Sequence, residues 1–206
     1  MSIIISESTK TKKELIPSGT HIARCYSMIH IGTQEFEYQG EKKQANKIRL
    51  TFELPLELKD FNGEYKPLVI DKEYTLSLHE KSNLRKDLES WRGKSFSPKE
   101  LANFDVTKLI GIACNISIIH KESNSGKMFA FISNISSLSK GVEAPSQIND
   151  SFEFNYTDKF NKEWLNEICP AWIKEQIEKS KEYKLSLLDN YDFDKETNDL
   201  EDDLPF

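Results

Sequence analysis

The sequence has few cysteines and no long apolar run. Its three cysteines, Cys25, Cys114 and Cys169, are odd in number and far apart, which fits free thiols in a reducing cytoplasm better than a disulfide framework. No CxxC pair suggests a zinc site. No apolar stretch approaches the roughly twenty residues that a membrane-spanning helix needs, and residues 1–7 do not resemble a signal peptide. We therefore expect a cytoplasmic protein with no membrane association, no metal and no cofactor.

The signatures of common enzymes are also missing. There is no glycine-rich phosphate loop, no nucleophile elbow and no set of kinase motifs. The histidines are dispersed and show no metal-ligand spacing; they are His21, His30, His79 and His120. We therefore expect no enzymatic activity. A nuclease built from distant carboxylates is the enzyme alternative, and dependence on magnesium would identify it.

Negative charge is plentiful, and it is concentrated at the C-terminus. Residues 189–206 hold eight Asp and Glu residues against one Lys, a side-chain charge of −7. A segment so charged is expected to be disordered. It nevertheless ends in an acidic pair and an apolar group, Asp202, Asp203, Leu204, Pro205 and Phe206. Such an end suits a partner pocket that joins an apolar cavity to a basic residue; the alternative is a merely solubilising tail.

The rest of the chain is slightly basic. The net charge is −6 for the whole chain, which leaves +1 for residues 1–188. Residues 10–141 carry 21 Lys and Arg against 16 Asp and Glu. This segregation suits an anion-binding module whose own tail competes for its groove when nucleic acid is absent.

The hydrophobic pattern at the start of the chain predicts β-strands. Residues 20–32 are rich in β-branched and aromatic residues and predict a long strand, whose mixed faces indicate sharp bending or burial on both sides. In residues 47–54 apolar and polar residues alternate, which predicts one face on a core and the other open to solvent or ligand. A third strand is expected over residues 74–78.

The spacing then becomes helical. Leu84, Leu88 and Trp91 recur at four- and three-residue intervals and predict a helix over residues 83–92, which Gly93 ends. A second short helix is expected to follow, because Ser97, Pro98 and Glu100 form a capping box with proline at the first helical position.

A hairpin over residues 113–120 and 127–135 completes the pattern. Three strands, a helical insert and two strands follow the order of an oligonucleotide/oligosaccharide-binding barrel. We predict a mainly β protein: an OB-fold-like five-stranded barrel with its helix between strands 3 and 4, plus a C-terminal helix and a disordered acidic tail. The expected parts are a flexible segment at residues 1–14, the barrel at 15–141, a linker and C-terminal helical region at 142–188, and the tail at 189–206.

The region 142–188 has a net charge of −3 and is a poor DNA surface. We expect it to pack across the barrel or to mediate self-association, so a homo-oligomer is compatible with the sequence.

One block carries a resemblance to a known family. The motif NLRKDLESWRG at residues 83–93 lies within the similar stretch 76–94, with Gly32-Thr33-Gln34 upstream and residues 136–141 downstream. Together they resemble a family of bacteriophage proteins encoded among replication and recombination genes, and the acidic end with Pro-Phe is similar to the ends of bacterial and phage single-stranded-DNA-binding proteins. The resemblance covers about residues 15–185. It implies coating of single-stranded DNA without sequence specificity and recruitment of replication or recombination proteins through the tail.

Single-strand binding needs cations along the phosphates and flat side chains on which bases stack. If Met128, Ala130 and Ile132 face inward, Phe129 and Phe131 point outward, where they either stack on bases or pack beneath the C-terminal helix or a partner subunit. The spacing of Trp91 favours a core role over stacking. The candidate DNA contacts are Arg24, Tyr26, Lys47, Arg49, Arg85, Lys86, Arg92, Lys94, Lys121, Lys127, Phe129 and Phe131; for Lys47 and Arg49 a solvated face is the alternative.

Two other functions share these features. A recombination mediator or annealing protein also binds single strands, and a strand-annealing assay separates it from a coating protein. A replication adaptor that does not bind DNA would ignore oligonucleotides, whereas a coating protein binds them in a salt-sensitive manner.

Overall fold

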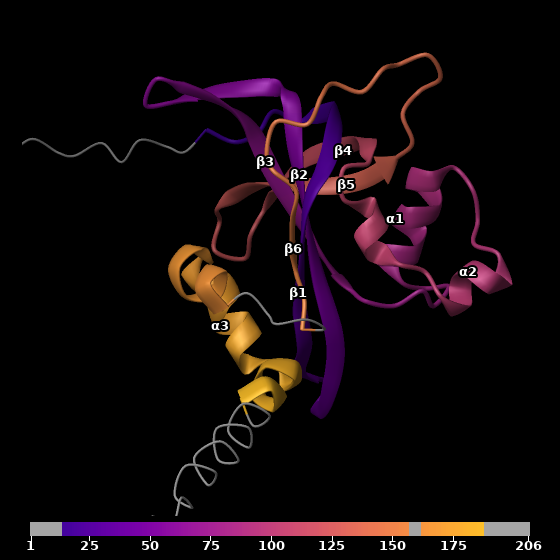
Figure 1. Cartoon of the computed structure of the whole chain (residues 1–206), viewed down its shortest axis with the longest axis vertical. Coiled ribbons are helices and arrows are strands. Elements are labelled where there is room, and N and C mark those ends of the chain that lie inside the picture. Colours follow the sequence, from indigo (N-terminus) through magenta and orange to yellow (C-terminus); the bar gives the residue numbers. More distant parts are fainter. Residues whose placement is uncertain (1–13, 157–161, 188–206) are drawn as a thin grey trace, which may run out of the picture.

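The computed structural model describes residues 14–156 and 162–187, and its main feature is a strongly curled, open sheet (Figure 1). Five antiparallel strands run in the order β3-β2-β1-β4-β5, and a short sixth strand pairs with β1 in parallel. This confirms a mainly β fold. The strands are β1 (Gly19–Tyr38), β2 (Glu41–Phe61), β3 (Glu64–Thr75), β4 (Ala113–Glu122), β5 (Met128–Ser136) and β6 (Phe152–Phe154).

Helical segments lie on two sides of this sheet in Figure 1. Between β3 and β4 the chain forms α1 (Asn83–Arg92), α2 (Pro98–Ala102) and the 3-10 helix η1 (Val106–Leu109). After β6 it forms the π-helical turn η2 (Trp164–Ile168) and α3 (Ala171–Lys179). Within the described ranges, none of the helices has the length and apolar character needed to cross a membrane.

The helix α1 has the predicted bounds and ends at the predicted glycine; its N-terminal cap, Ser82, was not predicted. The Ser82 hydroxyl accepts a hydrogen bond from the backbone N–H of Arg85, and Gly93 ends the helix in the left-handed conformation, with φ of 67°. Leu84, Leu88 and Trp91 are buried, and the indole Nε1 of Trp91 donates to the carbonyl of Ala113 over 2.9 Å. The core role of Trp91 is confirmed.

The third strand is displaced from its expected position. We expected a strand over residues 74–78, but β3 ends at Thr75. Leu76 and Leu78 follow it in an extended segment and pack against the core. The alternation of apolar residues here therefore reflects packing on the core. The segment makes one backbone hydrogen bond to β2, from Leu76 N to Asn46 O, but it is not a strand. The expected range of the third strand was wrong.

The strand β1 is buried on both faces. On its inner face Cys25 and Met28 join a core with Phe52, Leu88 and Ile116 inside the curled sheet. On its outer face lies a second core, which comprises Ile29, Ile31, Phe154, Trp164, Leu165, Ile173 and Ile177. Register shifts in its pairing with β2 bend the strand twice. The lack of a clean apolar and polar face in residues 20–32 thus has both of the causes that we named, bending of the strand and burial on both sides.

The second core attaches what we call the C-terminal layer, residues 145–156 and 162–187. Its strand β6 pairs with residues 27–29 of β1. Farther along, Gly32 has φ of +85°, and a Cβ there would lie 2.7 Å from Cβ of Ser180. Only glycine permits this close approach. The layer packs across the sheet, as one of the two expectations for residues 142–188 required.

Two predicted segments lie outside the described residues. They are residues 1–13 of the expected flexible N-terminal segment and the acidic tail at 189–206, with its partner-binding residues Asp202, Asp203, Leu204, Pro205 and Phe206.

Candidate nucleic-acid interface

The polar face of β2 is covered, contrary to our expectation of an open face. Arg49 is only 8% exposed. It donates to Asp71 and, over 2.7 Å, to Glu73 on β3, and Trp172 of α3 stacks on its guanidinium. Lys47 donates to the second oxygen of Glu73, also over 2.7 Å. Both candidate cations are therefore neutralised by carboxylates within the protein.

Arg24 is likewise engaged in hydrogen bonds within the protein. Its Nε donates to the carbonyl of Pro145 over 2.5 Å and its Nη1 to the carbonyl of Gly111 over 2.7 Å. Tyr26 lies beside it, half-buried. Burial and the negative charges of nearby carboxylates raise the pKa of the Tyr26 hydroxyl. These two candidates therefore lie at the boundary between the sheet and the C-terminal layer.

Glu53 is a fully buried carboxylate that sequence reasoning assigned to an open face. It accepts hydrogen bonds from the backbone N–H groups of Ile148 and Asn149, over 2.8 and 2.7 Å. The side-chain amide of Asn149 donates to it as well, over 2.6 Å. The segment that we expected to be a linker is thus fixed to β2 by three hydrogen bonds.

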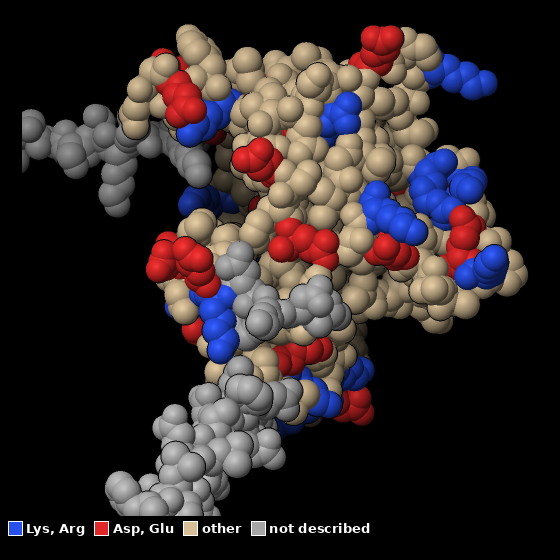
Figure 2. All heavy atoms as spheres, viewed as in Figure 1, with Lys and Arg blue, Asp and Glu red and all other residues tan. Residues whose placement is uncertain are grey.

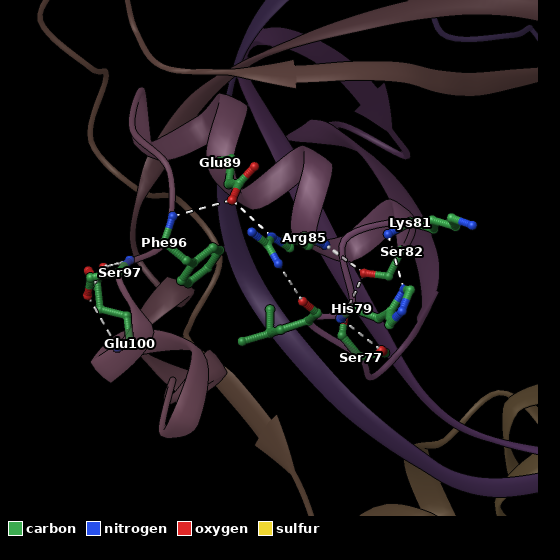
Figure 3. A network of polar contacts seen from close by, with 10 residues as sticks. Ser77, His79, Lys81, Ser82, Arg85, Glu89, Phe96, Ser97 and Glu100 are labelled. Atoms are coloured by element: carbon green, nitrogen blue, oxygen red, sulfur yellow. Dashed lines mark hydrogen bonds and ion pairs between the residues drawn. The ribbon is translucent and has the colours of Figure 1, made fainter.

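Arg85, which Figure 3 shows, and Arg92 make contacts within the helical connection between β3 and β4. Arg85 donates to Glu89 over 3.0 Å and to the carbonyl of Leu78 over 3.2 Å. Arg92 pairs with Glu100 and packs on the ring of Phe96, 4.3 Å from its centre. Figure 2 shows basic side chains interspersed with acidic ones on the side that carries α1 and α2. The two arginines are therefore committed to internal contacts.

Glu100 closes the predicted capping box of α2. Its carboxylate accepts from the backbone N–H and the hydroxyl of Ser97, over 2.8 and 2.9 Å. These hydrogen bonds, with the Arg92 pair, lower the pKa of Glu100 to about 2. Of the candidate lysines nearby, Lys94 lies 3.6 Å from Glu100, whereas Lys86 is exposed and has no ion pair within the described ranges.

The β4–β5 hairpin keeps an aromatic and basic face open to solvent. Phe129 lies opposite Lys121 in the strand register and is 39% exposed. The Nζ atom of Lys121 lies 3.6 Å from the centre of the neighbouring Phe131 ring, a cation–π contact. Lys127 is exposed where β5 begins. The second core contains no residue of β4 or β5 among those described, so the C-terminal layer does not bury this face.

The inward set predicted for β5 is only partly correct. Ile132 is buried and Ala130 half-buried, but Met128 is exposed. It lies at the end of the hairpin, beyond the part of the sheet that encloses the core.

The β1–β2 hairpin carries a similar set that sequence reasoning missed. Phe36 and Tyr38 are both exposed, and Nζ of Lys43 lies 4.8 Å from the centre of the Tyr38 ring. Gln39 and Gly40 form the turn, both with positive φ. The alternation of Phe36 and Tyr38 before a glycine turn was the available signal, but the strand had been ended at residue 32.

The structure therefore separates most of the candidates into two groups, and Tyr26, Lys86 and Lys94 belong to neither. Lys121, Lys127, Phe129 and Phe131 share one hairpin with an open face. Internal contacts engage Arg24, Lys47, Arg49, Arg85 and Arg92. No protein-family model matches the chain, and a search of curated proteins finds no match.

Proposed function

We propose that the protein binds single-stranded DNA without sequence specificity, as a coating protein of phage DNA replication or recombination. One observation carries the proposal: Phe129 is exposed on the β4–β5 hairpin, next to a half-buried Phe131 whose ring contacts Lys121. Flat rings offer stacking platforms to bases of any sequence, and lysines contact the phosphates between them.

The arrangement of strands supports this proposal. A five-stranded curled sheet with helices between the third and fourth strands fits an OB-like barrel. In that fold the loops that join strands 1 to 2 and 4 to 5 contact oligonucleotides. The exposed Phe36 and Tyr38 lie on the first of these hairpins, and the exposed Phe129 with the half-buried Phe131 lies on the second. We therefore assign the DNA path to the hairpins and not to the covered face of β2.

The acidic tail has two parts in the proposal. Its end, residues 202–206, recruits polymerase, helicase, primase or recombination proteins. The whole tail, residues 189–206, carries a charge of −7 and competes with DNA for the lysines of the hairpins. Deleting residues 189–206 then tightens DNA binding, most strongly at low salt, where charge interactions are least screened. Equal affinity of the full-length and shortened proteins at low salt contradicts the competition.

Fluorescence anisotropy tests the binding function. A labelled thymidine oligomer, single-stranded or annealed to its complement, is titrated with the full-length protein at low and moderate salt. The proposal requires preference for the single strand and weaker binding as salt rises, because phosphate contacts release counterions. A strand-annealing assay then separates a coating protein from a recombination mediator.

An adaptor is the second candidate, and an exposed apolar surface favours it. Leu58, Tyr65 and Val69 lie exposed on β2 and β3, and Ile148 is exposed in the segment that Glu53 holds to the same strands. Contiguous apolar surface of this kind marks protein contacts. Absence of binding to either oligonucleotide form, in full-length and tail-deleted protein alike, selects the adaptor.

A further inference from the structure

An apolar groove lies between the segment that follows β3 and the helix α2. Its volume is about 350 Å³. Besides the apolar residues named below, Ser77, Ala102 and Asn103 line it. A groove of this size lies at the lower end of the range for ligand pockets. Its apolar lining is formed by Leu76, Leu78, Leu84, Leu101, Phe104 and Val106.

None of the residues that line this groove is charged, but basic residues lie next to them in the chain. Arg85 is held against the groove by its hydrogen bond to the carbonyl of Leu78, and Figure 3 shows its side chain directed from α1 toward that segment. Lys81 and Lys99 are exposed nearby in the chain and form no ion pair in the part of the chain that the structure describes. Residues 76–108 carry seven Lys and Arg against five Asp and Glu.

The acid residues of this region are largely neutralised. Asp87, Glu89 and Glu100 each pair with a cation on β3 or on α1. Arg85 is itself neutralised by Glu89. Among the described residues of this stretch, Lys81, Lys86 and Lys99 and one carboxylate, Glu80, form no ion pair, so the groove lies beside a small surplus of positive charge. Its occupant should be an apolar segment with acidic neighbours.

The chain itself contains such a segment. Residues 202–206 read Asp-Asp-Leu-Pro-Phe, and residues 189–206 carry a charge of −7. The distance is also compatible: the residues from 188 to 204 span up to about 56 Å when extended. A domain of this length has a radius of gyration of about 16 Å, so the segment can reach the groove of its own molecule or of a neighbour.

A second depression on the surface fits this segment less well. It lies between the β1–β2 hairpin and the end of the C-terminal layer, and Leu185 is its one large apolar lining residue among those described. Its lysines, Lys179, Lys181 and Lys184, could attract the acidic residues but offer no floor for both Leu204 and Phe206.

We propose that residues 202–206 bind in the apolar groove, with Leu204 and Phe206 against its leucines and the two aspartates toward the unpaired lysines Lys81 and Lys99. The groove then stores the segment that recruits partners, and a partner must compete with it. This inference does not rest on DNA binding by the hairpins, and its test involves no DNA.

The test is a site-specific photo-cross-link in the full-length protein. Phe206→p-benzoylphenylalanine places the reactive group on the segment, and mass spectrometry locates the product after illumination. We expect cross-links to residues 76–78 or 101–106. Mixing isotopically light and heavy protein shows whether the segment comes from the same molecule or a neighbour, and both results support the proposal.

Two variants sharpen the test. Leu101→Glu places a carboxylate in the apolar lining and should lower the cross-link yield about tenfold, given the unfavourable burial of a charge. Leu56→Glu makes the same change at an exposed leucine on β2 and should leave the yield unchanged. Asp202→Asn with Asp203→Asn should lower it without touching the folded domain. Circular dichroism verifies that each variant is folded.

Three results overturn the proposal. They are cross-links confined to residues 179–185, cross-links spread over the surface without preference, and yields in the folded Leu101→Glu protein equal to those in the Leu56→Glu control.

Discussion

The guanidinium carbon of Arg49 on β2 lies 4.3 Å from the centre of the Trp172 ring on α3. Arg49 is buried, whereas Trp172 is 51% exposed, so the indole ring covers the guanidinium that is paired with Asp71 and Glu73. A surface tryptophan thus shields the buried arginine of this cluster from water, while the carboxylate of Asp71 stays exposed.

Replacing this ring should weaken the fold. Trp172→Ala removes a partly desolvated cation–π contact, and we expect a loss of about 0.5 to 2 kcal/mol in the free energy of unfolding. Trp172→Phe is the matched control and should retain part of that energy. Urea unfolding followed by circular dichroism measures both. Unchanged stability of the alanine variant would show that the contact contributes nothing.

Removing the rings of the β4–β5 hairpin should weaken DNA binding. Phe129→Ala and Phe131→Ala should each lower the affinity for single-stranded DNA by about 1 to 3 kcal/mol, the range for one stacked base. Phe61→Ala alters another exposed aromatic residue, at the end of β2, and should have little effect. Anisotropy titrations at one fixed salt concentration compare them. If all three variants bind alike, the DNA path lies elsewhere.

Loss of the Glu53 carboxylate should destabilise the sheet and the segment that follows β5 together. Glu53→Ala leaves the backbone N–H groups of Ile148 and Asn149 without their acceptor, and we expect a loss of about 2 to 5 kcal/mol, since each unsatisfied donor costs about 1 to 3 kcal/mol. Hydrogen exchange at these two amides should rise in the variant. Protection equal to that of the unaltered protein would mean that another group holds the segment.

The second core should be essential to stability. Ile177 is fully buried on the outer side of β1, and Ile177→Ala should cost about 2 to 5 kcal/mol, as for other buried isoleucines. Ile168→Ala changes a side chain that is 69% exposed and should change stability by less than about 0.5 kcal/mol. Thermal unfolding of the two variants makes the comparison. Equal midpoints would mean that the C-terminal layer is not part of the cooperative unit.

The capping box of α2 should make stability depend on pH in the acid range. The pKa of Glu100 is about 2 in the folded protein, against an ordinary value of 4.5. Its contribution is therefore fully present above pH 4.5 and is lost as the pH falls from 4.5 toward 2. The stability difference between the unaltered protein and Glu100→Gln should shrink over this window. A difference that stays constant would mean that the carboxylate keeps its ordinary pKa.

Local patterns in the sequence predicted the local structure well. Short-range spacing and side-chain chemistry predicted four local features: the glycine that ends α1, the capping box of α2, the hairpin of β4 and β5, and the core position of Trp91. The structure confirms them. These features depend on residues within a few positions of one another, which is why a single sequence reveals them.

The candidate site was less accessible from the sequence because burial depends on distant segments. The alternation of residues 47–54 indicated an open face at Arg49 and Glu53, but residues about 95 to 125 positions farther along the chain cover both side chains. A buried ion pair and a ligand-binding cation look the same in one sequence. Strand alternation alone placed Phe129 and Phe131 on the outward face of β5, where Phe129 is exposed and Phe131 half-buried.

The parallel pairing of β6 with β1 affects how the chain can fold during synthesis. The hydrogen bonds between residues 27–29 of β1 and residues 152–154 of β6 cannot form until residues 152–154 have left the ribosome. Until then the outer face of β1, including Ile29, has no cover, and a nascent chain with an unpaired, apolar strand edge is prone to aggregate. The C-terminal layer, which is synthesised last, thus supplies the pairing and the cover that β1 needs.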